Sequence, residues 1–231
     1  MRYALYFTPP KDDPLNTLAS RWLGRDAFTG MAFPTSSHDG ISGEEQYAVT
    51  ADPRRYGFHA TLKAPFGLAA SVNENDLMDV AGDFASRMAP FTIPELVLGQ
   101  LGPFFALVPA SLCQELQDFS ASVVKAFEPF RAALSDADIA RRKPEELSEA
   151  HHANLLRWGY PYVMDEFRFH MTLSGPVVPE RQPAIERVLR ETFADHIGRP
   201  LSISGLAVFV EETRGAPFIV RSWLPLGGAQ S

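Results

Sequence analysis

The chain has a single cysteine, Cys113, among its 231 residues, and it has no long hydrophobic run. A lone cysteine excludes an intramolecular disulfide and a cysteine metal cage, so a reducing, cytoplasmic setting is expected. The longest apolar segment, residues 201–210, contains Ser202 and Ser204, whereas a membrane-spanning helix needs about 18 or more apolar residues in succession. Residues 1–7 lack a charged region followed by an apolar stretch and a cleavage site, which predicts a first strand rather than a signal peptide. We therefore expect a soluble protein with no membrane partner.

The sequence also lacks the motifs of several large enzyme classes. It has no Gly-x4-Gly-Lys-Ser/Thr loop, no Gly-x-Gly-x-x-Gly turn, no His-Glu-x-x-His helix and no Gly-x-Ser-x-Gly elbow. These absences disfavour kinase-like, Rossmann and zincin chemistry. Positive charge is scarce too, because 21 Lys and Arg residues stand against 28 Asp and Glu residues, for a net charge of −7. That balance disfavours a long nucleic acid as partner, although a short RNA end can still fit a local basic pocket.

Apolar material for a core is present, since hydrophobic residues make up 45% of the sequence and 17 residues are phenylalanine. This composition is typical of a globular chain rather than a disordered one. At roughly 150 residues per domain, the length allows one large domain or two small lobes.

The order strand, helix, strand, strand occurs twice along the chain, which indicates two copies of one supersecondary unit. Each copy begins with a short strand closed by proline or Gly-Pro, continues with an amphipathic helix and ends with two apolar runs. The segments are residues 55–63, 77–88, 92–98 and 104–108 in the first copy, and 167–173, 185–193, 201–210 and 218–223 in the second.

Other segments precede and join the two copies. A helix is predicted over residues 14–23, with an Asp-Pro start and a Gly end. Residues 27–52 predict a long irregular segment, and the sequence leaves open whether it forms a lid. A helix over residues 112–127 and another over 144–158 are expected between the copies. The whole pattern predicts an α+β fold with largely antiparallel sheets rather than a doubly wound parallel sheet.

The two copies share a motif, Phe-His-x-Thr-Leu, which contains His59 and Thr61 in the first half and His170 and Thr172 in the second. Because side chains alternate across a strand, each histidine and its threonine point to one face while the flanking apolar residues point to the core. Packing of the halves about a pseudo-twofold axis would bring both pairs into one cleft.

Two histidines across a cleft suit the chemistry of a phosphodiester. A neutral imidazole can take a proton from the attacking water, and a protonated one can donate a proton to the departing oxygen. Histidine is suited to both roles because its unperturbed pKa is about 6.5. Threonine hydroxyls can donate hydrogen bonds to the nonbridging oxygens as charge develops. This chemistry requires neither a metal nor a cofactor.

The repeated His-x-Thr-Leu motif resembles the 2H phosphoesterase superfamily, which includes the RNA ligase and cyclic phosphodiesterase LigT group. The resemblance covers nearly the whole chain. It implies one bilobal LigT-like domain over residues 1–231, with approximate halves 1–110 and 111–231, a central cleft, helices on the outside and each motif on a central strand. By matching positions, it implies that His59 and His170 are the acid and base that act on a cyclic phosphodiester of a nucleotide or phosphorylated sugar. It also implies that Thr61 and Thr172 bind phosphate.

Two further segments, residues 157–162 and 167–170, resemble a branch of that superfamily associated with phosphonate-utilisation genes. This resemblance implies a role in phosphonate metabolism and a small phosphorylated sugar, such as a cyclic ribose phosphate, as substrate.

Several residues near the motifs are candidates for supporting roles. Strand alternation places Lys63 on the same face as the polar residues of the first motif, and Arg168 on the same face as those of the second. Both could therefore offset phosphate charge. The alternative for each is a solvated cation at the end of a strand. Ser174 has the position for a phosphate contact or for a turn hydroxyl. Adjacent His151 and His152 do not share a helix face, so they are not expected to chelate a metal.

The aromatic and basic residues close to the first motif have two interpretations. Arg54, Arg55 and Tyr56 precede the motif and either line the cleft or lie on the surface. Tyr3 and Tyr6, on the first predicted strand, are expected to pack in the core rather than reach a ligand.

Two other functions stay open. A lone strand histidine is usually structural, and two degenerate copies would give a module that binds a phosphorylated small molecule or an RNA terminus without turning it over. RNA end-joining is disfavoured by the negative charge and by the lack of an aromatic and basic RNA-binding signature. The sequence indicates neither the oligomeric state nor which histidine is the base.

Overall fold

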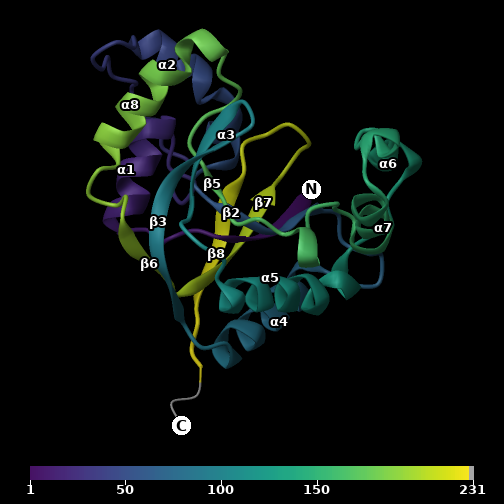
Figure 1. The fold of residues 1–231 in the computed structure, drawn as a ribbon. Coiled ribbons are helices and arrows are strands. Elements are labelled where there is room, and N and C mark those ends of the chain that lie inside the picture. The colour runs from purple at the N-terminus through teal and green to yellow at the C-terminus, as the bar shows by residue number, and fades with distance from the viewer. Residues whose placement is uncertain (229–231) are drawn as a thin grey trace.

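The computed structural model describes residues 1–228, which form two four-stranded antiparallel sheets with helices packed around them (Figure 1). The predicted α+β class is confirmed. The strands are β1 (Arg2–Phe7), β2 (Ala60–Phe66), β3 (Phe91–Leu101), β4 (Phe104–Pro109), β5 (Met171–Thr172), β6 (Arg199–Ile203), β7 (Gly205–Glu211) and β8 (Ile219–Pro225). The α-helices are α1 (Pro14–Leu23), α2 (Gly43–Val49), α3 (Ala51–Tyr56), α4 (Glu74–Arg87), α5 (Gln114–Ala126), α6 (Asp136–Ala140), α7 (Glu149–Trp158) and α8 (Gln182–Thr192). Short 3-10 helices are η1 (Glu128–Phe130), η2 (Pro144–Glu146), η3 (Met164–Glu166) and η4 (Pro179–Arg181).

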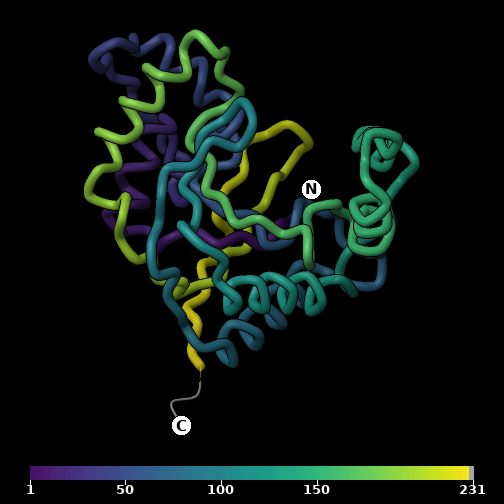
Figure 2. Tube along the Cα trace, viewed as in Figure 1, coloured from purple at the N-terminus to yellow at the C-terminus, as the bar shows by residue number. Residues whose placement is uncertain are grey.

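Each sheet takes strands from both halves of the sequence. The first sheet has the order β2-β1-β7-β8 and the second has the order β5-β4-β3-β6. Figure 2 shows the purple N-terminal strand running beside the yellow C-terminal strands, in agreement with the antiparallel pairing of β1 with β7. The two sheets therefore do not coincide with residues 1–110 and 111–231.

The chain passes from the second sheet to the first at Ser204. The apolar run 201–210 was predicted as one strand, but it forms the end of β6 and most of β7, which belong to different sheets. Ser204 separates them, and its carbonyl accepts a hydrogen bond from the Leu226 amide. Apolar periodicity does not reveal such a switch, because only one residue separates the two strands.

The two motif strands lie at corresponding positions, each at an edge of its sheet. β2 is the outer strand of the first sheet and β5 is the outer strand of the second. The resemblance implied central strands, and this expectation is corrected. An edge strand leaves room beside it, and the histidine of each motif lies immediately before that strand.

The motif residues alternate between core and cleft as predicted. Phe58, Ala60 and Leu62 of the first motif are buried, whereas His59 and Thr61 are partly exposed. The second motif repeats this pattern, with Phe169, Met171 and Leu173 in the core. Helices α4 and α5 cover the first sheet, and Trp22 of α1 donates a hydrogen bond to the Leu173 carbonyl beside β5. The buried residues hold the two motif strands in place.

Some element boundaries differ from those predicted. Residues 55 and 56 end α3 rather than begin a strand, and only Met171 and Thr172 of the predicted strand 167–173 pair with β4. Residues 27–41 are irregular as expected, but α2 and the start of α3 occupy most of 43–52. Helix α6 was not predicted. Within residues 1–228, no helix combines the length and apolar character that crossing a bilayer requires.

Candidate active site

The four polar motif residues line one cavity of about 310 Å³. His59 and Thr61 come from the N-terminal end of β2, and His170 and Thr172 come from the corresponding end of β5. The two imidazoles interact electrostatically, since positive charge on His170 lowers the pKa of His59. Two motifs that are far apart in the sequence thus share one site.

The ring of His59 is fixed by a backbone carbonyl and an aromatic neighbour. Its Nδ1 lies 2.9 Å from the carbonyl oxygen of Gly57, and its Nε2 lies 3.3 Å from Thr61 Oγ1. The ring stacks on Tyr6, with centroids 4.0 Å apart and planes inclined by 26°. Tyr6 therefore both packs in the core, as expected, and lines the cavity.

His170 repeats the same local geometry. Its Nδ1 lies 2.8 Å from the carbonyl oxygen of Arg168, which is again two residues earlier. A carbonyl only accepts hydrogen bonds, so Nδ1 carries the proton in both histidines. In each ring Nε2 remains as the atom that can accept a proton when the imidazole is neutral or donate one when it is charged.

Burial lowers the pKa of both histidines. Desolvation is the main cause at His59, whose pKa falls to about 4, and the nearby His170 lowers it further. Desolvation also lowers the pKa of His170, and a hydrogen bond to the Arg168 carbonyl opposes this shift. Both imidazoles are consequently neutral at neutral pH in the free protein.

The turn before His59 depends on Gly57. This residue has φ 81° and ψ 175°, a backbone conformation essentially restricted to glycine. A Cβ added there would lie 2.4 Å from the Cβ of Ala27. Gly57 ends α3 and directs its carbonyl to the imidazole, so the local fold sets the tautomer of the histidine.

Lys63 does not line the cavity, which corrects the prediction from strand parity. Tyr6 pairs with Thr61, and the next residue back on β1, Leu5, pairs with Lys63, so β2 contains an extra residue at this point. This β-bulge reverses the alternation. The Lys63 ammonium is buried and lies 2.7 Å from Glu128 Oε2.

The side chain of Arg168 is also outside the cavity of the two histidines. It is exposed and lines a separate hollow together with residues of α5. Arg168 lies on the exposed side of the alternation, between the buried Phe167 and Phe169, but before the paired strand β5 begins. Arg168 contributes to the site through its backbone carbonyl.

Of the other residues predicted to lie near the motifs, some line the cavity and some do not. Tyr56 lines the cavity, whereas Arg54 lies over the Tyr47 ring and Arg55 pairs with Glu211. Ser174 lines the cavity but is buried, and its Oγ accepts a hydrogen bond from the Phe105 amide at 3.0 Å.

Sequence reasoning missed several lining residues. Asp52, Phe104, Arg142 and Tyr160 all line the cavity. Phe104 lies 5.9 Å from His170 between ring centroids, and the Arg142 guanidinium lies 4.9 Å from the Tyr160 ring centroid. None belongs to the repeated motif, although Tyr160 lies in the segment 157–162 that carries the second resemblance and Phe104 begins the predicted apolar run 104–108.

The acidic and histidine residues of the described chain do not gather into a metal site. Within residues 1–228 no three His, Cys, Asp or Glu side chains are placed to hold an ion. His151 instead lies 3.0 Å from Glu166 and packs against Tyr162.

Two curated relatives match almost the whole chain. The protein "Ribose 1,5-bisphosphate phosphokinase PhnN" of Janthinobacterium sp. (strain Marseille) is 36% identical over 231 residues, which cover 98% of this chain and 51% of the relative. The protein of the same name from Laribacter hongkongensis (strain HLHK9) is 32% identical over 241 residues, covering 100% of this chain and 54% of the relative. The chain thus spans about half the length of the curated relatives it matches.

Two solved structures have a weaker likeness. The crystal structure of TT0787 of Thermus thermophilus has a TM-score of 0.49 and 14% identity, covering 99% of this chain and 100% of that one. A crystal structure described as that of a phosphoesterase has a TM-score of 0.43 and 13% identity, covering 97% of this chain and 98% of the other.

A protein-family comparison matches residues 61–219. The match includes His170 and both threonines of the site, and it begins two residues after His59. Because it covers more than half of the sequence, the chain belongs to the family described as "Protein of unknown function (DUF1045)".

Proposed function

We propose that this protein is a metal-independent phosphoesterase of the 2H type, which hydrolyses a cyclic phosphodiester of a nucleotide or phosphorylated sugar. The observation that carries the proposal is the matched pair of imidazoles in one cavity. Each has its Nδ1 fixed by the carbonyl two residues earlier, which leaves Nε2 to exchange a proton.

The reaction uses both protonation states of histidine. The neutral histidine takes a proton from a water molecule as its oxygen forms a bond to phosphorus. The bond from phosphorus to one ring oxygen breaks, and the protonated histidine donates its proton to that oxygen. The product is a phosphomonoester, and proton exchange with solvent restores the starting state.

We assign the base to His59 and the acid to His170. Burial and the neighbouring histidine hold the pKa of His59 at about 4, so His59 loses its proton more readily. A bound phosphate anion raises the pKa of an imidazole beside it. With substrate bound, His170 can therefore carry the proton that the acid must donate. Thr61 and Thr172 would donate hydrogen bonds to the nonbridging oxygens.

The names of the relatives bear on the substrate. Both are named for a kinase that acts on ribose 1,5-bisphosphate, yet this chain matches only about half of each and has no Gly-x4-Gly-Lys-Ser/Thr loop. We infer that the kinase name describes the other half of those proteins and that this chain acts on a related sugar phosphate in phosphonate metabolism. Long nucleic acid is not the proposed partner, given the net charge of −7.

A substrate panel tests the proposal. Purified protein in excess chelator is incubated with 2′,3′-cyclic nucleotides and cyclic sugar phosphates, and phosphorus NMR follows the conversion of diester to monoester. Turnover of at least one cyclic substrate is expected. Calorimetric binding without any product would instead favour the binding module.

The assignment of acid and base has its own test. A p-nitrophenyl phosphodiester has a leaving group that departs without a proton, so the acid matters less for it. His170→Ala is expected to lose much less activity on this ester than on a cyclic substrate, whereas His59→Ala is expected to lose activity on both. The reverse pattern would exchange the two roles.

A further inference from the structure

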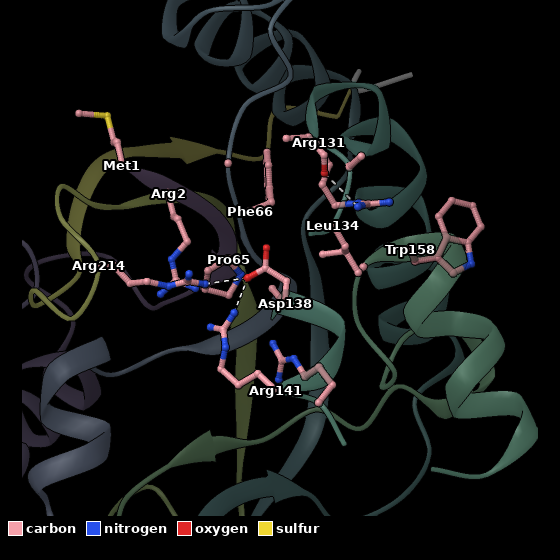
Figure 3. A pocket seen from close by; sticks show the side chains of 16 residues that line it. Met1, Arg2, Pro65, Phe66, Arg131, Leu134, Asp138, Arg141, Trp158 and Arg214 are labelled. Carbon is pink, nitrogen blue, oxygen red and sulfur yellow. Dashed lines mark hydrogen bonds and ion pairs between the residues drawn. The ribbon is translucent and has the colours of Figure 1, made fainter. Parts of the chain in front are cut away.

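A second cavity adjoins the active site and is lined by arginines. It has a volume of about 330 Å³ and shares Ala64, Pro65 and Arg142 with the cavity of the two histidines. Figure 3 shows this second cavity, which extends from Pro65 towards Arg131 and Trp158. A molecule bound at His59 and His170 can therefore extend into it.

The charged side chains that line this cavity are mostly basic. Five guanidinium groups and a single carboxylate line it, although the protein as a whole is acidic. Arg141 and Arg214 both hydrogen-bond to Oδ1 of Asp138, and Arg214 does so at 2.8 Å (Figure 3). These hydrogen bonds hold the Asp138 carboxylate in its charged form by lowering its pKa. A phosphate group that replaces the Asp138 carboxylate between these two arginines would accept hydrogen bonds from the same guanidinium groups.

Arg142 connects the two cavities. Among residues 1–228 it forms no ion pair, and its guanidinium lies 4.9 Å from the centroid of the Tyr160 ring. Its charge is therefore available to an anion in either cavity. Arg2 and Arg131 differ, because Arg2 pairs with the fully buried Glu211 and Arg131 pairs with Glu128, so both are partly neutralised.

We propose that the arginine cavity binds a second phosphate group of the same substrate, so that the substrate is a sugar or nucleoside with both a cyclic phosphodiester and a phosphate monoester. This inference rests on the proposed function, since the histidine cavity holds the diester. A monoester fits a cluster of guanidinium groups better than a further diester of an RNA chain, because a monoester carries up to two negative charges and a diester carries one. The arginines are binding groups for the phosphate that does not react.

Matched substrates test the inference. Adenosine 2′,3′-cyclic phosphate is compared with its 5′-phosphorylated form in chelator, and the ratio of their kcat/KM values is measured. The extra phosphate is expected to raise kcat/KM by about 10- to 100-fold, as for one or more hydrogen bonds to a charged group. Arg214→Gln and Arg141→Gln should each reduce this ratio by about 10-fold. Equal kcat/KM values for the two substrates in the wild type would overturn the proposal.

A control variant separates the local effect from a general loss of charge. Arg190→Gln removes an exposed arginine of α8 that pairs with Glu186, outside both cavities. It should leave the ratio unchanged. If a cyclic trinucleotide were a better substrate than the phosphorylated mononucleotide, the second phosphate would belong to an RNA chain and the monoester proposal would be wrong.

A binding measurement keeps the inference testable without turnover. Calorimetry compares ribose 5-phosphate with ribose on the wild type and on the Arg141→Gln and Arg214→Gln variants. Binding of ribose 5-phosphate that weakens in both variants supports the arginine cavity even if no cyclic substrate is hydrolysed, in which case only the proposed function fails. Affinity that is the same in the wild type and both variants would contradict the second phosphate site.

Discussion

The imidazole of His59 lies stacked on the phenol ring of Tyr6, with ring centroids 4.0 Å apart. Tyr6 is buried, and burial raises the pKa of its hydroxyl well above the usual value. The stack comes from strand β1, which pairs directly with the motif strand β2. The first strand of the chain therefore forms one wall of the candidate active site.

Two substitutions at Tyr6 separate its ring from its hydroxyl. Tyr6→Phe keeps the stack and is expected to change kcat/KM less than about 10-fold, since at most one hydrogen bond is lost. Tyr6→Ala removes the ring and should cost about 3–5 kcal/mol in the free energy of unfolding, as other large-to-small core changes do. Steady-state kinetics and urea unfolding measure the two effects. Equal loss of activity in both folded variants would show that the hydroxyl, not the stack, is required.

Gly57 gives a test of the carbonyl that fixes the His59 tautomer. Gly57→Ala places a methyl group against Ala27 and forces a conformation that costs about 1–3 kcal/mol. The carbonyl should shift away from Nδ1, so kcat should fall in the protein that remains folded. The matched control is Gly82→Ala in α4, where an added Cβ meets no atom within 4 Å, and it should stabilise the helix by about 0.5–1 kcal/mol. Unchanged kcat in Gly57→Ala would contradict the claim that this turn positions His59 for catalysis.

The motif pattern explains how far the sequence alone leads. Burial of Phe58 and Met171 and the cleft position of His59 and His170 follow from strand alternation, which depends only on local geometry. Lys63 breaks the same rule because a β-bulge depends on pairing with β1, a strand more than fifty residues earlier. Local periodicity contains no information about that pairing.

The other residues of the site could be identified only from the tertiary structure. Arg142 and Tyr160 come from the connection between the two sequence repeats and reach the cavity only through the packing of that connection. The change from one sheet to the other likewise depends on the break at Ser204, where a single residue separates β6 from β7. Neither the packing of the connection nor the change of sheet can be predicted from local sequence.

The buried pair of Lys63 and Glu128 gives a prediction about stability rather than catalysis. Glu128→Gln leaves the buried ammonium without a carboxylate partner and should cost about 3 kcal/mol in the free energy of unfolding. Lys63→Met removes the buried charge while Arg131 still pairs with Glu128, so its cost should be below about 1 kcal/mol. Denaturant unfolding measures both. A large loss of kcat/KM in Lys63→Met, with stability retained, would return Lys63 to the binding site.

The lowered pKa values predict how stability depends on pH. The pKa of His59 is about 4 in the folded protein and about 6.5 when unfolded, so the unfolded state binds more protons between these values. The free energy of unfolding should therefore rise with pH across this window and fall as pH decreases through it. His170 contributes in the same direction. Urea unfolding at pH values from 5 to 6.5 gives the free energy of unfolding as a function of pH. This free energy should rise less steeply with pH in the His59→Ala, His170→Ala double variant than in the wild type. The same pH dependence in both proteins would contradict the burial of the pair.

The most direct test of two-histidine catalysis is the turnover of one cyclic phosphodiester, with chelator present, by the wild type, His59→Ala, His170→Ala and the double variant. Each single variant is expected to lose about 10²- to 10⁴-fold in kcat, and the double variant should lose little more, because the two groups act in one step. Circular dichroism and the unfolding transition verify that each variant is folded. A folded double variant that turns over substrate at the wild-type rate would contradict the account.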